Sequence, residues 1–205
     1  MYNRTITVET IKRLDNNAPG IQKWLNDDII EVYMQLLCDQ YSSSNNILLL
    51  NTHFMDKLLD IDNNKRYTYD NVKRWTKQNV FNFDKIFIPI NINNCHWVLI
   101  IIFIHHKQIM YYDSNISNED KSAFYLDTTL SWLYDENIKW NINNLRRSDW
   151  NKDLPIMPQQ NNNYDCGVFL LAIAEDVFKS NTTATFTQKD IPQIRLKIAI
   201  SIVES

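Results

Sequence analysis

Glycine is nearly missing from this chain of 205 residues, which contains only Gly20 and Gly167. Its three cysteines have no metal-type spacing, which is typical of a reducing compartment and not of a disulfide framework. The apolar run 98–104 has seven residues, far fewer than the roughly 20 that a membrane-spanning helix needs. The first residues also lack the apolar stretch of a secretory signal. We therefore expect an intracellular protein, nuclear or cytoplasmic.

Positive charge is not in excess either. The net charge is −3 and the sequence pI is about 5.8, which argues against a protein that binds nucleic acid through phosphates. Hydrophobic residues make up 44% and charged residues 22% of the chain, as in an ordinary globular protein. The length suits one domain, and no repeat or long linker divides it. We predict a single catalytic domain over residues 1–205, a monomer, with no cofactor and no metal site.

The periodicity of apolar residues changes along the chain. Segments 85–90, 96–104 and 108–113 are rich in β-branched and aromatic residues and predict three strands, the second buried on both faces. Helical spacing after Asn26, a good N-cap, predicts a helix over 27–37. Further helices are predicted at 121–135, 167–179 and from 187 onward, with shorter ones at 9–14, 52–59 and 69–77 and a strand at 5–8. Helices that flank a small central sheet indicate the α+β class.

Three residues together could form a cysteine protease centre. Cys166 stands where an Asn-rich loop turns into an apolar helix, and a helix N-terminus favours a thiolate. His96 opens the central strand, and Asp113 ends the next one, so pairing of the two strands places a carboxylate beside an imidazole. Gly167 would allow a substrate backbone to approach closely. Taken alone, each has a blander interpretation: a core cysteine, a packing histidine or a turn aspartate.

Gln160 lies six residues before Cys166. Its amide could donate to a developing oxyanion, and the backbone N–H of Cys166 would be the second donor. A polar loop residue is the alternative, and Gln159 beside it leaves the choice between the two glutamines open.

Several short motifs, taken together, resemble the Ulp/SENP family of SUMO-specific cysteine proteases, in family order and over nearly the whole chain. They are Trp24-Leu25-Asn26-Asp27, Val72-Lys73-Arg74-Trp75-Thr76-Lys77, Cys95-His96-Trp97, Tyr111-Tyr112-Asp113-Ser114, Pro158-Gln159-Gln160 with Asp165-Cys166-Gly167, and Phe186-Thr187-Gln188. The resemblance implies a papain-like, adenain-like α+β fold with a small central mixed sheet flanked by helices. It also implies a catalytic triad of His96, Asp113 and Cys166, with Gln160 in the oxyanion hole.

The same resemblance implies a substrate site. Trp24 and Trp97 would roof a tunnel that admits only residues without side chains, which suits the Gly-Gly end of a ubiquitin-like tail. Asp27 and Arg74 match family positions that contact the modifier's surface. Core packing is the alternative for the tryptophans, and ordinary surface charge is the alternative for Asp27 and Arg74.

These observations predict a SUMO-specific isopeptidase that cleaves after the C-terminal Gly-Gly and that could also mature the SUMO precursor. SUMO, or another ubiquitin-like protein, and its conjugates would be the partners. Ubiquitin or a related tag as substrate, acetyl transfer on the same fold, and a binding module that recognises the modifier without cutting it are the alternatives.

Overall fold

The computed structural model describes residues 6–41, 46–60, 66–115, 121–142, 144–181 and 183–205. Its centre is a sheet in the order β1-β2-β3-β4-β5. The strands are β1 (Ile47–Leu49), β2 (Lys85–Ile92), β3 (His96–Phe103), β4 (Gln108–Tyr112) and β5 (Asn151–Asp153). The three middle strands are antiparallel, and both edge strands pair in parallel. The predicted mixed sheet and α+β class are therefore confirmed.

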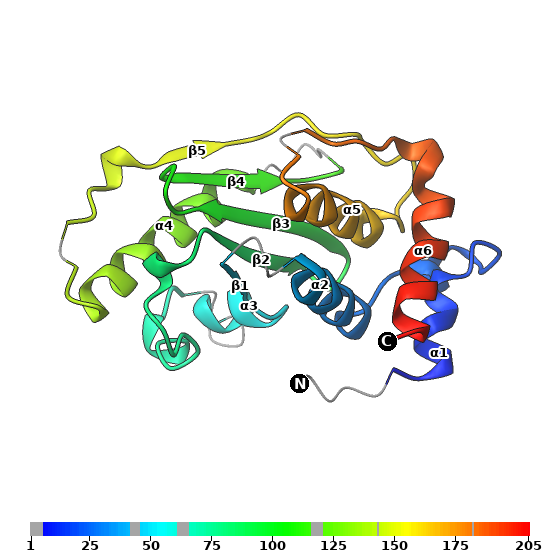
Figure 1. Ribbon diagram of the computed structural model, residues 1–205, viewed down its shortest axis with the longest axis horizontal. Helices are drawn as coiled ribbons and strands as arrows, with labels where there is room; N and C mark the ends of the chain where they lie inside the picture. Colours follow the sequence, from blue (N-terminus) through cyan, green and yellow to red (C-terminus); the bar gives the residue numbers. More distant parts are fainter. Residues whose placement is uncertain (1–5, 42–45, 61–65, 116–120, 143, 182) are drawn as a thin grey trace.

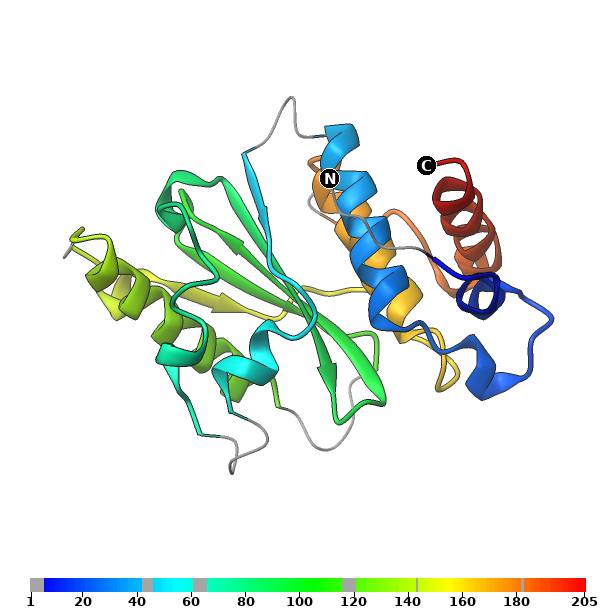
Figure 2. The same cartoon turned by 90° about the horizontal axis from the view of Figure 1, so that it is seen from below.

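Helices cover both faces of this sheet, as Figure 2 shows. On one face lie α2 (Asp27–Tyr41) and α5 (Cys166–Phe178), and α6 (Ile191–Val203) packs on their outer side, with the short α1 (Val8–Ile11) beside α6 (Figure 1). The other layer contains α3 (Phe54–Leu58) and α4 (Ser122–Lys139). None of the described helices is both long and apolar enough to cross a membrane.

Strand β3 separates two hydrophobic cores. Trp97, Leu99 and Ile101 pack with α2 and α5, whereas Val98, Ile100 and Ile102 pack with α3 and α4. This alternation follows from the two-residue period of a strand. It confirms that β3 is buried on both faces, and it explains why its sequence is almost continuously apolar.

Turns with left-handed residues fix the positions of the strand ends. Asn93 and Asn94 have φ of 53° and 55° between β2 and β3, and Lys107 has φ of 50° between β3 and β4. Asparagine tolerates this backbone region better than most residues. The first turn places His96 at the beginning of β3, and the second brings β4 back beside it.

The structure differs from the predicted elements in four places. Strands β1 and β5 were not expected, and each has only three residues. The helix predicted at 69–77 is a single turn, Tyr69–Asn71. Within the strand predicted at 5–8, Thr7 is instead the N-cap of α1 and accepts a hydrogen bond from the Thr10 N–H; Thr5 lies outside the described residues.

Candidate active site

His96 and Asp113 meet at one edge of the sheet. His96 Nε2 lies 2.7 Å from Asp113 Oδ1, and both side chains are mostly buried. The same carboxylate oxygen accepts the Asn115 N–H at 2.8 Å, and Gln159 donates to the Asp113 carbonyl at 3.0 Å. The expected neighbourhood of imidazole and carboxylate is therefore confirmed, with Asp113 held from both its side chain and its backbone.

Cys166 is the first residue of α5 and is buried, with 5% of its surface exposed. Burial by itself lowers the pKa of His96, but hydrogen bonds and charge interactions with Asp113 and Cys166 outweigh it and raise the pKa to about 9. Because Asp113 occupies Nε2, Nδ1 is the ring nitrogen left for Cys166. The three side chains thus form one interacting group, although they come from three separate elements.

The first turn of α5 offers backbone donors beside the sulfur. The Asp165 carbonyl accepts the N–H groups of Val168 and Phe169, at 2.8 and 3.0 Å. The N–H groups of Cys166 and Gly167 precede this ladder, where a helix has no intrahelical acceptors to offer. Such donors, with the positive end of the helix dipole, stabilise an anion.

Hydrogen bonds with Ser114 and Asn162 fix the side chain of Gln160, and its amide nitrogen is a donor. Its Oε1 accepts from the Ser114 hydroxyl at 2.7 Å, and its backbone N–H donates to the Ser114 carbonyl at 2.8 Å. Its Nε2 donates one hydrogen to the Asn162 carbonyl at 2.5 Å, which leaves the second amide hydrogen for another acceptor. Gln159 points instead to backbone carbonyls, including that of Asp113. Of the two glutamines, Gln160 is the one with an amide hydrogen to offer beyond this loop.

Trp97 is almost fully buried, and its indole N–H donates to the Leu25 carbonyl at 2.8 Å. Trp24, the residue before Leu25, is half-buried. A Cβ atom at Gly167 would lie 3.0 Å from Leu25 Cβ. Leu25 therefore packs against α5 where Gly167 has no side chain, and the close approach of a substrate backbone stays a prediction.

The two predicted modifier-contact residues lie in different layers. Asp27 begins α2 and is half-buried, in the layer of α5 and α6. Arg74 is exposed and belongs to the segment that precedes β2, which Lys139 of α4 anchors by donating to the Lys73 and Thr76 carbonyls, each at 2.8 Å. The two residues could contact one ligand only if it were large enough to reach both layers.

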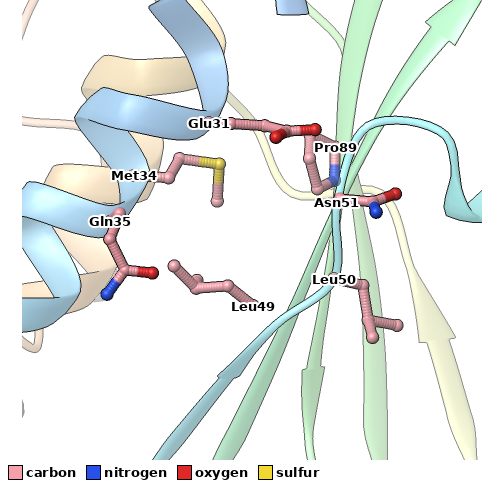
Figure 3. Close-up of a pocket in the computed structure, with 7 residues that line it drawn as sticks. All are labelled: Glu31, Met34, Gln35, Leu49, Leu50, Asn51 and Pro89. Carbon is pink, nitrogen blue, oxygen red and sulfur yellow. The ribbon is translucent and has the colours of Figure 1, made fainter. Parts of the chain in front are cut away.

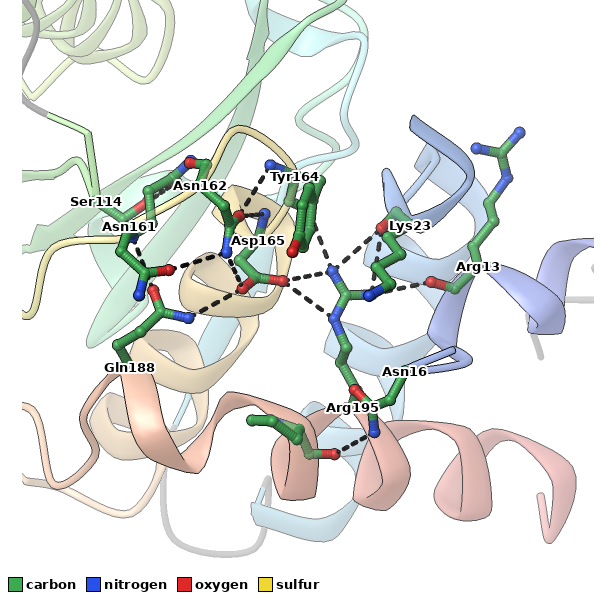
Figure 4. A network of polar contacts seen from close by, with 12 residues as sticks. Arg13, Asn16, Lys23, Ser114, Asn161, Asn162, Tyr164, Asp165, Gln188 and Arg195 are labelled. Carbon is green, nitrogen blue, oxygen red and sulfur yellow. Dashed lines mark hydrogen bonds and ion pairs between the residues drawn. The ribbon is translucent and has the colours of Figure 1, made fainter. Parts of the chain in front are cut away.

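Sequence reasoning missed a buried ion pair beside the candidate nucleophile. Arg195 of α6 reaches Asp165 Oδ1 with two nitrogens, at 2.7 and 3.1 Å (Figure 4). The side chains are 1% and 5% exposed. The available signal was a cation at the helical spacing of the buried face, four residues after Ile191 and three before Ile198.

Other candidate features lie away from this group. A cavity of about 40 Å³ between α2 and the β1–β2 edge is lined by Glu31, Met34, Gln35, Leu49, Leu50, Asn51 and Pro89, none of which belongs to the predicted site (Figure 3). Burial and the nearby Asp39 raise the pKa of the Cys38 thiol, which disfavours its reactive form. Within the described ranges no three His, Cys, Asp or Glu side chains gather as metal ligands.

Comparisons with known proteins give a consistent result. The family model described as the Ulp1 protease family, C-terminal catalytic domain, matches residues 23–205. A sentrin-specific protease of Caenorhabditis elegans is 31% identical over 186 residues, which cover 88% of this chain and 25% of that protein. The chain therefore spans only part of the length of this curated relative.

Two solved structures share the fold closely. A SUMO protease Ulp1 with its catalytic cysteine oxidized to a sulfonic acid superposes with a TM-score of 0.79 at 30% identity, covering 97% of this chain and 84% of that one. The C-terminal Ulp1 protease domain in complex with Smt3, the yeast ortholog of SUMO, gives a TM-score of 0.77 at 29% identity, covering 97% and 83%. On the family match and the relative's identity together, this chain belongs to the Ulp1 protease family.

Proposed function

We propose that this chain is a cysteine protease that removes SUMO by cleaving after its C-terminal Gly-Gly. The observation that carries the proposal is the placement of His96 between Asp113 and Cys166, with the sulfur at the N-terminus of α5. Family membership and the relatives named as sentrin-specific and SUMO proteases support the choice of substrate. Maturation of the SUMO precursor would be the same reaction on a peptide bond.

The chemistry needs Cys166 as a thiolate beside a protonated His96, and the raised pKa of His96, about 9, keeps its ring an imidazolium at neutral pH. Asp113 holds Nε2–H and stabilises the positive ring, because a carboxylate at 2.7 Å favours the charged form. The thiolate attacks the carbonyl carbon of the terminal glycine. The oxygen becomes an oxyanion that the Cys166 N–H and the Gln160 amide would bind.

The tetrahedral intermediate then collapses. The imidazolium gives its proton to the departing amine, which is a target lysine or the first residue of a C-terminal extension, and a thioester remains on Cys166. His96 next takes a proton from water, and the hydroxide attacks the thioester. The free carboxylate of the modifier leaves, and the thiol is regenerated.

Two indoles would select the substrate. We place the Gly-Gly tail between Trp24 and Trp97, with the folded part of the modifier on a surface that includes Asp27 and Arg74. The hydrogen bond from Trp97 to the Leu25 carbonyl supports this arrangement, because it fixes the Trp24 segment relative to the strand that bears His96. A slot lined by flat rings admits glycine and excludes larger side chains.

Cleavage of a SUMO fusion by Cys166→Ala, Asp113→Asn and Cys38→Ala variants tests the proposal. We expect no turnover by Cys166→Ala with SUMO binding retained, a large loss for Asp113→Asn, and normal turnover by Cys38→Ala, which is the matched cysteine control. Cleavage by Cys166→Ala would disprove the proposed nucleophile. Cleavage of a ubiquitin fusion in place of the SUMO fusion would keep the chemistry and reject the modifier.

A further inference from the structure

The side chain of Asp165 does not cap the helix that it precedes. Asp165 is the N-cap residue of α5, with φ −91° and ψ −6°, and its side chain makes no capping hydrogen bond. Aspartate is among the preferred N-cap residues because its carboxylate usually accepts an N–H of the first turn. Here the carboxylate points toward α6 (Figure 4). The N–H groups of the first turn of α5 therefore do not donate to the Asp165 carboxylate.

Arg195 accounts for this orientation. Besides Asp165, its guanidinium donates to the carbonyls of Arg13, Lys23 and Tyr164, at 2.9 to 3.2 Å. A planar guanidinium with five N–H donors can satisfy this many acceptors at once, which an ammonium cannot do in the same geometry. The carboxylate is therefore held by a cation that is itself fixed by three backbone segments.

The other carboxylate oxygen is held as well. Asp165 Oδ2 accepts from Asn162 Nδ2 at 2.7 Å and from Gln188 Nε2 at 3.0 Å. The Asn162 side chain in turn accepts the backbone N–H groups of Tyr164 and Asp165. Both carboxylate oxygens are therefore occupied by donors from outside α5.

The network reaches two parts of the proposed site. The Asn162 carbonyl accepts a hydrogen bond from the side-chain amide of Gln160, the proposed oxyanion donor. At the opposite end, Arg13 holds Arg195 through its carbonyl and donates through its own guanidinium to the Trp24 carbonyl at 2.8 Å. Gln160, Asp165, Arg195 and the Trp24 segment are thus linked through consecutive hydrogen bonds.

We propose that Arg195 is a positioning residue that keeps the Asp165 carboxylate off the N-terminus of α5 and offsets its charge, so that the first-turn N–H groups serve the Cys166 thiolate and the substrate oxyanion. This inference rests on the proposed cysteine protease function. A free carboxylate at this N-cap would accept the Gly167 N–H, a donor of the first turn, and its negative charge would disfavour a thiolate in the next residue.

The test compares Arg195→Met with the double variant Asp165→Ala/Arg195→Met. We measure the iodoacetamide alkylation rate of Cys166 at pH 7 by peptide mapping, and kcat and KM on a SUMO fusion. In Arg195→Met we expect about tenfold slower alkylation, because an unpaired carboxylate beside the sulfur disfavours the thiolate, and a lower kcat with a similar KM. In the double variant we expect both rates to recover, because the competing carboxylate is gone.

Lys197→Met is the matched control. Lys197 also lies on α6 and pairs with α5, through Glu175, but it does not contact the loop before Cys166. We expect its alkylation and turnover to stay within about twofold of the wild type, since Lys197 is half-exposed and Glu175 keeps its ion pair with Lys179. Equal losses in Lys197→Met and Arg195→Met would overturn the proposal, because they would reflect only weaker packing of α6.

A second substitution covers the case in which Arg195→Met does not fold, since breaking one side of a buried ion pair is strongly destabilising. Gln188→Ala removes one donor from Asp165 Oδ2 at a half-buried position and leaves no unpaired charge. We expect about threefold slower alkylation, in keeping with the loss of one hydrogen bond. Unchanged alkylation in Gln188→Ala, or a double variant no faster than a folded Arg195→Met, would refute the positioning role.

Alkylation separates this inference from the proposed function, because it needs no modifier. If the wild type fails to cut a SUMO fusion while the variants show the expected alkylation pattern, the positioning role stands and the proposed substrate is wrong. If wild-type Cys166 reacts no faster than Cys38 or Cys95, both fail.

Discussion

Replacing Gly167 with alanine would push the Trp24 segment away from α5. The added Cβ would lie 3.0 Å from Leu25 Cβ and 3.2 Å from Leu25 Cγ and Cδ1. The neighbour must therefore move by a few tenths of an ångström or more. Leu25 is 3% exposed and its carbonyl holds the Trp97 indole, so the displacement passes to both tryptophans of the proposed slot.

Two opposing contributions, overpacking and the helix propensity of alanine, determine the change in the free energy of unfolding. Overpacking a core costs about 1–3 kcal/mol, and alanine in place of glycine within a helix recovers about 0.5–1 kcal/mol. We expect a net loss of about 1 kcal/mol in the free energy of unfolding, with an upper bound of about 2.5 kcal/mol. The effect on turnover should be larger, since a misplacement of about 1 Å in a positioning element can cost about 100-fold in rate.

Urea unfolding and kcat/KM on a SUMO fusion measure the two effects, and Gly20→Ala is the matched control. A Cβ at Gly20 meets no atom within 4 Å, so we expect wild-type stability and rate. Wild-type values for Gly167→Ala in both measurements would show that the Leu25 contact does not position the slot. A loss in kcat/KM no larger than the loss in Gly20→Ala would show the same.

Four further predictions concern the other parts of the site. In the folded protein the pKa of His96 is raised to about 9 from about 6.5. The contribution of His96 to stability is therefore full below pH 6.5 and is lost as the pH rises through 9. NMR titration of the ring should give a midpoint near 9 in the wild type and a lower one in Asp113→Asn, and an unchanged midpoint in this variant would contradict the pairing. The rate kcat/KM should fall above about pH 9 as the imidazolium loses its proton, whereas a flat profile to pH 10 would exclude His96 as the acid. Trp97→Phe removes one buried hydrogen bond and should lower the free energy of unfolding by about 1 kcal/mol. It should also lower kcat more than it weakens SUMO binding. Equal losses in rate and binding assays would make Trp97 a packing residue only. Lys139→Met should loosen the segment that bears Arg74 and raise the Kd for SUMO without slowing iodoacetamide alkylation of Cys166, and the converse result would reject Arg74 as part of the docking surface.

The elements that the sequence predicted well are those with long, regular patterns. Strand β3 was visible because its apolar run is bounded by polar turns, and α2 because a capping Asn26 precedes apolar residues at helical spacing; Asn26 Oδ1 indeed accepts the Ile29 N–H at 3.3 Å. Strands β1 and β5 were missed because three residues show no period. They are strands only because the edges of β2 and β4 provide pairing partners, which is tertiary information.

The contacts of the candidate site also fall into those that local sequence patterns predict and those that they do not. The pairing of His96 with Asp113 could be predicted, because two adjacent strands and a short turn determine it. The ion pair of Asp165 with Arg195 joins residues 30 positions apart on different elements. Its only local sign was one arginine on an otherwise apolar helix face, and a periodicity argument treats such a residue as an exception. The contact of Leu25 with Gly167 likewise depends on how α5 packs, and no local pattern contains it.

The central claim is that Cys166 is the nucleophile and that SUMO is the modifier. Incubation of the protein with SUMO that carries a C-terminal electrophile, followed by peptide mapping, tests both points at once, with a ubiquitin probe alongside. We expect a covalent SUMO adduct on Cys166 and none with ubiquitin. An adduct on Cys95 or Cys38, or a Cys166 adduct with ubiquitin and not with SUMO, would contradict the claim.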